Sequence, residues 1–272
     1  MKIIFLFSIV FSLHIGIAKS EMRGVVGILE VGTEGTNHKL MFSKQYYDGK
    51  ETWKSLKEVY EEDYWKDKKG KWTIAFDGKS LGNIKLNIPN EKTPRILNKG
   101  KLFGGWASLP EFRPLVLNSK PYYKDPEKWK PYKISKDERK KLYPLLRVSI
   151  GSVNAYKCEG YDNVPFNYGL KDMIVNKAYR SKNSSILVSV GINDKARRCE
   201  GANQKHHDKY WFYIKGDHVD SVGKDMDLVD AGDYDNDGNS EFIFWYSGYN
   251  KDGYILMYNN FKQEIRYTWG YH

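Results

Sequence analysis

Short apolar runs alternate with polar turns along most of the chain, and this pattern predicts a protein built from β-strands. Each run is rich in β-branched and aromatic residues and is bounded by Gly, Asp, Asn or Lys, which is typical of strands joined by turns. The runs expected to form strands are Val25–Val31, Lys39–Ser43, Trp72–Phe76, Met173–Val175, Ile186–Val190, Tyr210–Ile214, Leu228–Ala231, Phe242–Tyr246 and Tyr254–Tyr258. No helical period competes with the runs after residue 173. The pattern therefore predicts an all-β fold made of short antiparallel hairpins.

The middle of the chain departs from this pattern because all 9 prolines lie between residues 89 and 165. Proline cannot donate a hydrogen bond to a β-ladder, so an irregular insertion is expected over about residues 89–147. One short helix is predicted within it, over Lys136–Arg147, with Ser135 as its N-cap. Pro144 is expected to limit the length of this helix.

The first twenty residues, 1–20, have the three-part layout of a secretory signal peptide. A lysine precedes the apolar stretch Ile3–Ile17, and the small residues Ala18 and Ser20 lie three and one positions before a plausible cleavage point. The stretch is shorter than the roughly 20 residues of a spanning helix, so a signal anchor is the weaker alternative. We therefore expect a secreted or periplasmic protein whose mature part, 21–272, is a single all-β domain without a transmembrane segment.

The overall composition is basic and polar. The 272 residues include 44 Lys+Arg and 34 Asp+Glu, a formal net charge of +10, and the mean hydropathy of −0.66 excludes a polytopic membrane protein. Basic clusters over 128–133 and 136–141 are suited to an acidic polysaccharide or another polyanion, although dispersed lysines also serve solubility alone. Because export is expected, intracellular nucleic acid is not an expected partner.

The two cysteines, Cys158 and Cys199, are each preceded by a basic residue and followed by Glu-Gly. Two cysteines are too few for a Cys-rich zinc site or a disulfide scaffold. An oxidising compartment allows this pair to bond, so we expect one intramolecular disulfide. Two unpaired thiols are the alternative.

The segment 233–241 reads Asp-Tyr-Asp-Asn-Asp-Gly-Asn-Ser-Glu, with carboxylates at loop positions 1, 3, 5 and 9. Alternating carboxylates can converge on one hard cation, and Ca²⁺ takes six to eight oxygen ligands. An EF-hand needs a Glu at position 12, where this chain has Phe244 in an apolar run, so the loop is expected to join two strands. A solvated acidic turn is the alternative, and Mg²⁺ is disfavoured by its strict octahedral geometry. The expected ligands are the side chains of Asp233, Asp235, Asp237 and Glu241 and the backbone carbonyl of Asn239, aimed by the turn at Gly238.

This loop, together with the preceding Leu228–Ala231, resembles the calcium-binding hairpin of FG-GAP and VCBS repeats, the blades of integrin-α-like β-propellers. The resemblance covers about residues 210–258 and implies that this part forms one blade, with Ca²⁺ bound between two of its strands. Glu241 stands where that family usually has Asp, and the chain contains no second loop of this type. The resemblance implies a β-propeller-like fold, and a β-sandwich carrying one calcium hairpin is the alternative.

No sequence motif in the chain identifies a catalytic centre. HExxH and Walker loops are absent, and His206 and His207 are interpreted as part of an exposed loop. Aromatic residues near the prolines are hypothetical sugar-stacking positions: Trp106, Tyr122, Tyr123 and Trp129. The favoured function is an exported calcium-binding module for non-catalytic binding or adhesion, with a polysaccharide, an acidic glycan or another protein as partner. The alternatives are a secreted polysaccharide hydrolase or lyase and a polyanion-binding surface protein.

Overall fold

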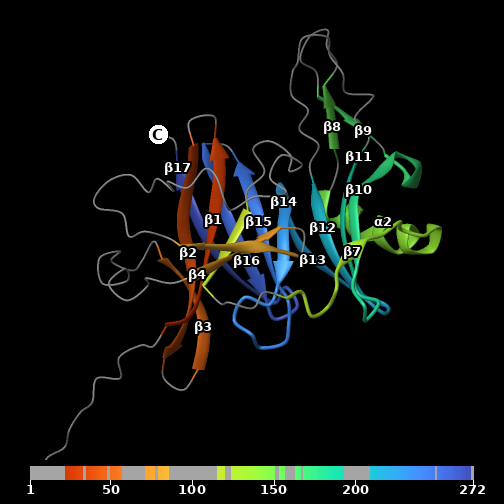
Figure 1. Cartoon of the computed structure of the whole chain (residues 1–272). Coiled ribbons are helices and arrows are strands. Elements are labelled where there is room, and N and C mark those ends of the chain that lie inside the picture. Colours follow the sequence, from red (N-terminus) through yellow and green to blue (C-terminus); the bar gives the residue numbers. More distant parts are fainter. Residues whose placement is uncertain are drawn as a thin grey trace, which may run out of the picture.

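Stacked antiparallel β-sheets form most of the described structure, and a single α-helix lies at one end of the stack (Figure 1). The structure is a computed structural model that describes residues 22–32, 35–47, 50–56, 71–76, 79–85, 115–119, 124–150, 153–156, 163–166, 168–192, 209–248 and 250–270. Every run that the hydrophobic pattern assigned to a strand lies within a strand of this structure. The all-β prediction is therefore confirmed.

The six-stranded sheet contains the N-terminal strands in the spatial order β3-β2-β1-β6-β4-β5. Its strands are β1 (Met22–Gly32), β2 (Gly35–Tyr47), β3 (Lys50–Ser55), β4 (Lys71–Phe76), β5 (Lys79–Lys85) and β6 (Leu115–Asn118). The position of β6 corrects the expectation that residues 89–147 are irregular throughout. Its four residues include no proline, and Val116 and Leu117 are fully buried, so the segment can pair with β1 and β4 inside the sheet.

The five-stranded sheet has the order β13-β12-β11-β10-β7. Its strands are β7 (Lys130–Pro131), β10 (Met173–Arg180), β11 (Ile186–Ile192), β12 (Tyr210–Lys215) and β13 (His218–Lys224). Pro131 lies on the edge strand β7, where a missing N–H is tolerated. Between α2 and β10 the chain forms a two-stranded ribbon, β8 (Val153–Tyr156) and β9 (Asn163–Phe166), and the 3₁₀-helix η3 (Leu170–Asp172).

The four-stranded sheet is a meander in chain order. Its strands are β14 (Met226–Gly232), β15 (Glu241–Gly248), β16 (Lys251–Tyr258) and β17 (Gln263–Gly270). The expected grouping over 210–258 differs from this sheet at both ends: Tyr210–Ile214 belongs to β12 in the five-stranded sheet, and β17, after residue 258, completes the four-stranded sheet. A turn at Gly216, with φ +61°, folds β13 back onto β12, so β12 has β11 and β13 as its neighbours and no edge left for β14.

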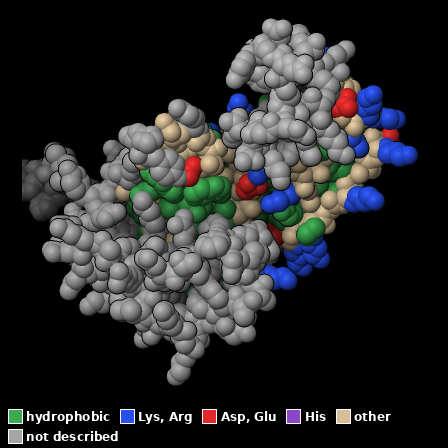
Figure 2. Space-filling view, turned by 90° about the horizontal axis from the view of Figure 1, so that it is seen from above, with side chains coloured by type: hydrophobic (Ala, Val, Ile, Leu, Met, Phe, Trp, Pro, Cys, Tyr) green, Lys and Arg blue, Asp and Glu red, His purple; other side chains and the backbone are tan. Residues whose placement is uncertain are grey.

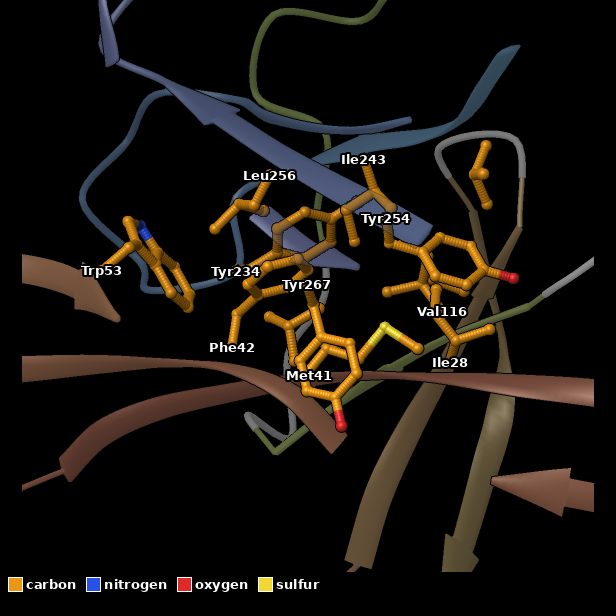
Figure 3. Packing of buried hydrophobic residues seen from close by; sticks show 13 residues of the cluster. Ile28, Met41, Phe42, Trp53, Val116, Tyr234, Ile243, Tyr254, Leu256 and Tyr267 are labelled. Carbon is orange, nitrogen blue, oxygen red and sulfur yellow. The ribbon is translucent and has the colours of Figure 1, made fainter. Parts of the chain in front are cut away.

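The four-stranded sheet is the central layer and is covered on both faces. Its first face packs on the six-stranded sheet, where the large aromatic side chains of both sheets interdigitate (Figure 3). Its second face packs on the five-stranded sheet, where Trp211 contacts Phe244 with ring centroids 5.3 Å apart. Burial on both faces explains why Phe242–Phe244 and Tyr254–Met257 are apolar at consecutive positions instead of alternate ones.

Helix α2 (Lys136–Ile150) covers the outer face of the five-stranded sheet. Its predicted start is confirmed, since the Ser135 hydroxyl accepts the Glu138 N–H and the Glu138 carboxylate accepts the Ser135 N–H. The helix runs past Pro144, as the predicted range to Arg147 requires, and ends at Ile150, beyond the expected end. Pro144 is exposed, whereas Leu142 and Leu146 on either side of it are fully buried. Packing of these leucines offsets the roughly 3 kcal/mol cost of an internal proline.

Within the described ranges, no helix is both long and apolar enough to span a membrane. The expected signal peptide, residues 1–20, lies outside those ranges, and so do Cys158 and Cys199. Cleavage of the signal peptide and pairing of the cysteines stay predictions.

Candidate metal centre

The acidic loop, defined here as residues 233–241, is the connection between β14 and β15. The last rung of that ladder pairs Gly232 with Glu241, so the loop is closed at its base by strand pairing. Within the turn, Asn236 has φ +64° and Gly238 has φ +89°. Both values lie in the left-handed region, which Asn and Gly adopt more readily than other residues. The residue types at these two positions therefore match the sharp reversals of the backbone.

The aspartates of the loop organise its backbone through hydrogen bonds to their side chains. The Asp233 carboxylate accepts the N–H of Asp237 and the N–H of Gly238, both at 3.0 Å. Asp235 Oδ1 accepts the Asp237 N–H at 3.1 Å, and Asp237 Oδ1 accepts the Asn239 N–H at 2.8 Å. These bonds wrap the turn around its own carboxylates. The loop is thus a compact structure and not an extended acidic strand.

Three of the predicted ligands converge in this arrangement. One carboxylate oxygen from each of Asp233, Asp235 and Asp237 lies within 4.8 Å of the others, so the three could hold a metal ion. Asp233 is buried and Asp237 is exposed, and Asp235 is half-buried as a whole residue although its side chain is only 3% exposed. The three carboxylates are therefore open to solvent on the side of Asp237. An all-oxygen donor set fits a hard divalent cation.

Glu241 lies at the start of β15 and anchors the loop from inside. It is only 2% exposed, and its Oε2 accepts the N–H of Tyr234 at 2.8 Å. Burial raises the pKa of Glu241 well above its ordinary value, and the nearby charges of Asp235 and Asp237 raise it further. The pKa of Asp233 is raised for the same reasons, first by burial and then by its carboxylate neighbours, against the hydrogen bond from Gly238. In both groups burial is the largest cause of the raised pKa, and the neighbouring carboxylates act in the same direction.

The expected ligand set is only partly brought together by the structure. Glu241 is not among the oxygens that lie within 4.8 Å of one another. Asn239 is exposed, and both its N–H and its side-chain amide donate to Asp237 Oδ1. Ligation by Glu241 and by the Asn239 carbonyl stays a prediction.

A lysine from another sheet reaches the loop, and sequence reasoning missed it. Lys44 on β2 places its Nζ 2.5 Å from Asp235 Oδ2, and the two side chains are 9% and 3% exposed. Burial lowers the pKa of Lys44, but the hydrogen bond and ion pair with Asp235 outweigh burial and raise the pKa overall. The Lys44 ammonium also lies 5.6 Å from the ring centre of Trp53 and 5.9 Å from that of Tyr258. Because the partners are 191 positions apart in the sequence, no local pattern could have identified this contact.

A second segment, residues 124–129, supports the loop from the side of the five-stranded sheet. The Asp125 carboxylate accepts the backbone N–H groups of Glu127, Lys128 and Trp129 and also the Ser240 hydroxyl, the last at 2.9 Å. The Lys124 carbonyl accepts the Asp233 N–H at 2.8 Å. Both ends of the acidic loop are therefore tied to a turn that lies more than 100 residues earlier in the chain.

Of the hypothetical sugar-stacking residues and the two neighbouring histidines, only Trp129 lies within the described ranges. Trp129 packs against Phe242, with ring centroids 5.4 Å apart, and its indole N–H donates to Glu127, so it is half-buried in the core. His206, His207 and the remaining hypothetical sugar-stacking aromatics lie outside the described ranges.

The basic side chains gather over the end of the molecule that carries α2 and the five-stranded sheet (Figure 2). Several of them are paired: Lys141 lies 2.5 Å from Asp217, and Lys140 lies 3.8 Å from Asp137. The Arg139 guanidinium donates to the carbonyls of Leu170 and Met173, which takes it out of any exposed cluster.

Comparison of the chain with protein-family models, with curated proteins and with solved structures finds no match. The resemblance to FG-GAP and VCBS repeats therefore rests on the loop sequence and its neighbouring strands alone.

Proposed function

We propose that this protein is an exported, calcium-binding, β-propeller-like protein with a non-catalytic binding or adhesion role. The observation that carries the proposal is the convergence of Asp233, Asp235 and Asp237 at the turn between β14 and β15. In this proposal Ca²⁺ neutralises the acidic loop and holds the hairpin closed. The ion thereby keeps the central sheet rigid for a surface that binds a partner.

The choice of calcium follows from the donor chemistry and from the backbone. The donors are carboxylate oxygens on a nine-residue turn, which suits the six to eight oxygen ligands and variable geometry of Ca²⁺ better than the strict octahedron of Mg²⁺. No cysteine or histidine lies in 233–241, so soft-metal chemistry is not favoured.

The propeller-like part of the proposal is supported by how the strands follow one another. Strands β10–β13 and β14–β17 are each four consecutive antiparallel strands, which is the order within a propeller blade. A single residue, Asp225, connects β13 to β14, and the two sheets then pack face to face. A stack of sheets in a sandwich uses the same contacts, so the number and closure of blades remain part of the proposal.

The binding role rests on the resemblance to FG-GAP and VCBS repeats, and the basic end of the molecule suggests the chemistry of the partner. Exposed lysines over α2 and the five-stranded sheet suit an acidic glycan, and another protein or a neutral polysaccharide is the alternative partner.

The test is calcium binding by the mature protein, measured by calorimetry and by thermal unfolding in EDTA and in 1 mM Ca²⁺. A site with a Kd of about 10 μM would gain about 2.7 kcal/mol at this concentration, which raises Tm by roughly 5–10 °C. Asp235→Asn should weaken the response, and Asp235→Ala should nearly abolish it. Asp217→Ala, which removes an exposed carboxylate on another sheet, is the matched control and should respond like the wild type. If the wild-type Tm does not move and no heat of binding is seen at millimolar Ca²⁺, the proposed function fails.

A further inference from the structure

Lys44 is a cation that the fold itself places at the acidic loop. It lies on β2 of the six-stranded sheet, whereas Asp235 lies in the acidic loop that connects two strands of the four-stranded sheet, so their ion pair joins the two layers. With both side chains less than 10% exposed, water screens this pair weakly. The pair is therefore a buried ion pair, and removing either partner would leave the other charge buried and uncompensated.

The charge balance of the loop shows what this lysine does. The loop carries three aspartates and Glu241, and Lys44 offsets only one of these four negative charges when all are ionised. Asp235 Oδ1 already accepts the Asp237 N–H, so the Lys44 ammonium bonds the other oxygen, Oδ2. A cation held by the three aspartates would lie close to this ammonium and would repel it.

We propose that Lys44 competes with the metal ion for Asp235, and so sets the metal affinity of the acidic loop and couples ion binding to the contact between the six-stranded and four-stranded sheets. This inference rests on the proposed function, because it concerns the same site. When the ion binds, the ammonium leaves Asp235 and stays near the ring faces of Trp53 and Tyr258, which attract a desolvated cation. The loop then exchanges an internal monovalent cation for a divalent one.

The experiment compares Ca²⁺ binding to the wild type and to Lys44→Met, which keeps the apolar stem of the side chain and removes its charge. We expect Ca²⁺ to bind Lys44→Met at least about tenfold more tightly, because the ion no longer has to displace a like charge. In EDTA the variant should melt at a lower temperature than the wild type, since the acidic loop has lost its counter-cation. The rise in Tm on adding Ca²⁺ should therefore be larger in the variant.

Two controls separate this effect from a general change of charge. Lys141→Met removes the same charge and an ion pair of the same length, but on α2, and should leave the Ca²⁺ affinity within about twofold of the wild type. Lys44→Arg keeps the charge and should bind Ca²⁺ like the wild type, within about threefold. If Lys44→Met does not fold in EDTA, it is refolded in Ca²⁺ and its affinity is measured by competition with a chelator.

The outcomes distinguish this inference from the proposed function. Lys44→Met that binds Ca²⁺ no more tightly than the wild type, or only as tightly as Lys141→Met, overturns the competition. A wild type that binds no Ca²⁺ beside a Lys44→Met variant that does would support the competition and contradict the proposed function, since Lys44 would then replace the metal outright. Absence of binding in both proteins overturns both.

Discussion

Gly238 gives a direct measure of how strongly the backbone of the acidic loop constrains its residue types. Its φ is +89°, and a Cβ built at this position would have no heavy atom within 4 Å apart from its immediate chain neighbours. Gly238→Ala therefore introduces backbone strain without a steric clash. The left-handed region costs an L-residue about 1–2 kcal/mol, so the free energy of unfolding should fall by that amount.

Two further substitutions of Gly238 test whether backbone strain is the cause, because strain predicts the order of their stability costs. Gly238→Asn should cost clearly less than Gly238→Ala, because Asn tolerates the left-handed region, as Asn236 does in the same turn with φ +64°. Gly238→Val should cost more, because a β-branched residue is a genuine outlier there. Urea unfolding monitored by circular dichroism in 1 mM Ca²⁺ measures all three variants, and calorimetry shows whether part of the loss is weaker Ca²⁺ binding.

Gly253 on β16 is the matched control, because its constraint is steric instead of conformational. A Cβ there would lie 2.4 Å from the Tyr267 carbonyl oxygen and 2.7 Å from the Thr268 Cα. At this position Ala already clashes with backbone, and Asn should be at least as harmful as Ala. If Gly238→Ala unfolds like the wild type, or if Gly238→Asn is as harmful as Gly238→Val, the reasoning about the turn is refuted.

Two more predictions concern the support of the loop and the start of α2. Asp125→Ala removes four accepted hydrogen bonds and should lower the free energy of unfolding by roughly 2–4 kcal/mol. Ser240→Ala removes one of these hydrogen bonds and should lower the free energy of unfolding by about 0.5–1.5 kcal/mol. Equal losses for the two variants in urea unfolding would contradict this role of Asp125. Burial acts to raise the pKa of Glu138, but hydrogen bonds from Ser135 and Tyr132 and the charge of Arg180 outweigh burial and lower the pKa below its ordinary 4.5. The stabilisation from this ionised carboxylate is therefore fully present above about pH 4.5 and is lost as the pH falls through the folded-state pKa. Glu138→Gln should be less stable than the wild type at pH 7, and the stabilities of the two proteins should converge at acid pH. A difference in stability that does not change across that pH range would refute the assignment.

The strand content, the start of α2 and the shape of the acidic loop were all predictable from the sequence. Each depends on residues that are close together in the chain: β-branched and aromatic runs between turn residues, Ser135 three positions before Glu138, and alternating aspartates followed by Gly238. Such features form their hydrogen bonds within a few residues, as the Asp233 carboxylate does with the Gly238 N–H. Local composition therefore carries enough information to place them.

The late end of the helix and the different grouping of the strands arose where tertiary packing decides the outcome. Pro144 favours a helix end, but the burial of Leu142 and Leu146 on the other side of α2 keeps the helix intact to Ile150. The assignment of 210–214 to the C-terminal sheet failed because the chain passes from β13 to β14, and hence from one sheet to the next, through the single residue Asp225. Strand runs look alike in sequence whichever sheet they join.

The electrostatic surroundings of the loop were decided by tertiary structure alone. Lys44 contacts Asp235 of the loop from 191 positions earlier in the sequence, and Asp125 contacts Ser240 from 115 positions earlier. Nothing in the sequence around Lys44 or Asp125 marks either residue as a partner of the loop. The sequence determined that four carboxylates lie within nine residues. The burial of Asp233 and Glu241, and with it the raised pKa of Glu241, depends on how the sheets pack around the base of the loop, because desolvation is a property of the packed structure and not of the chain segment.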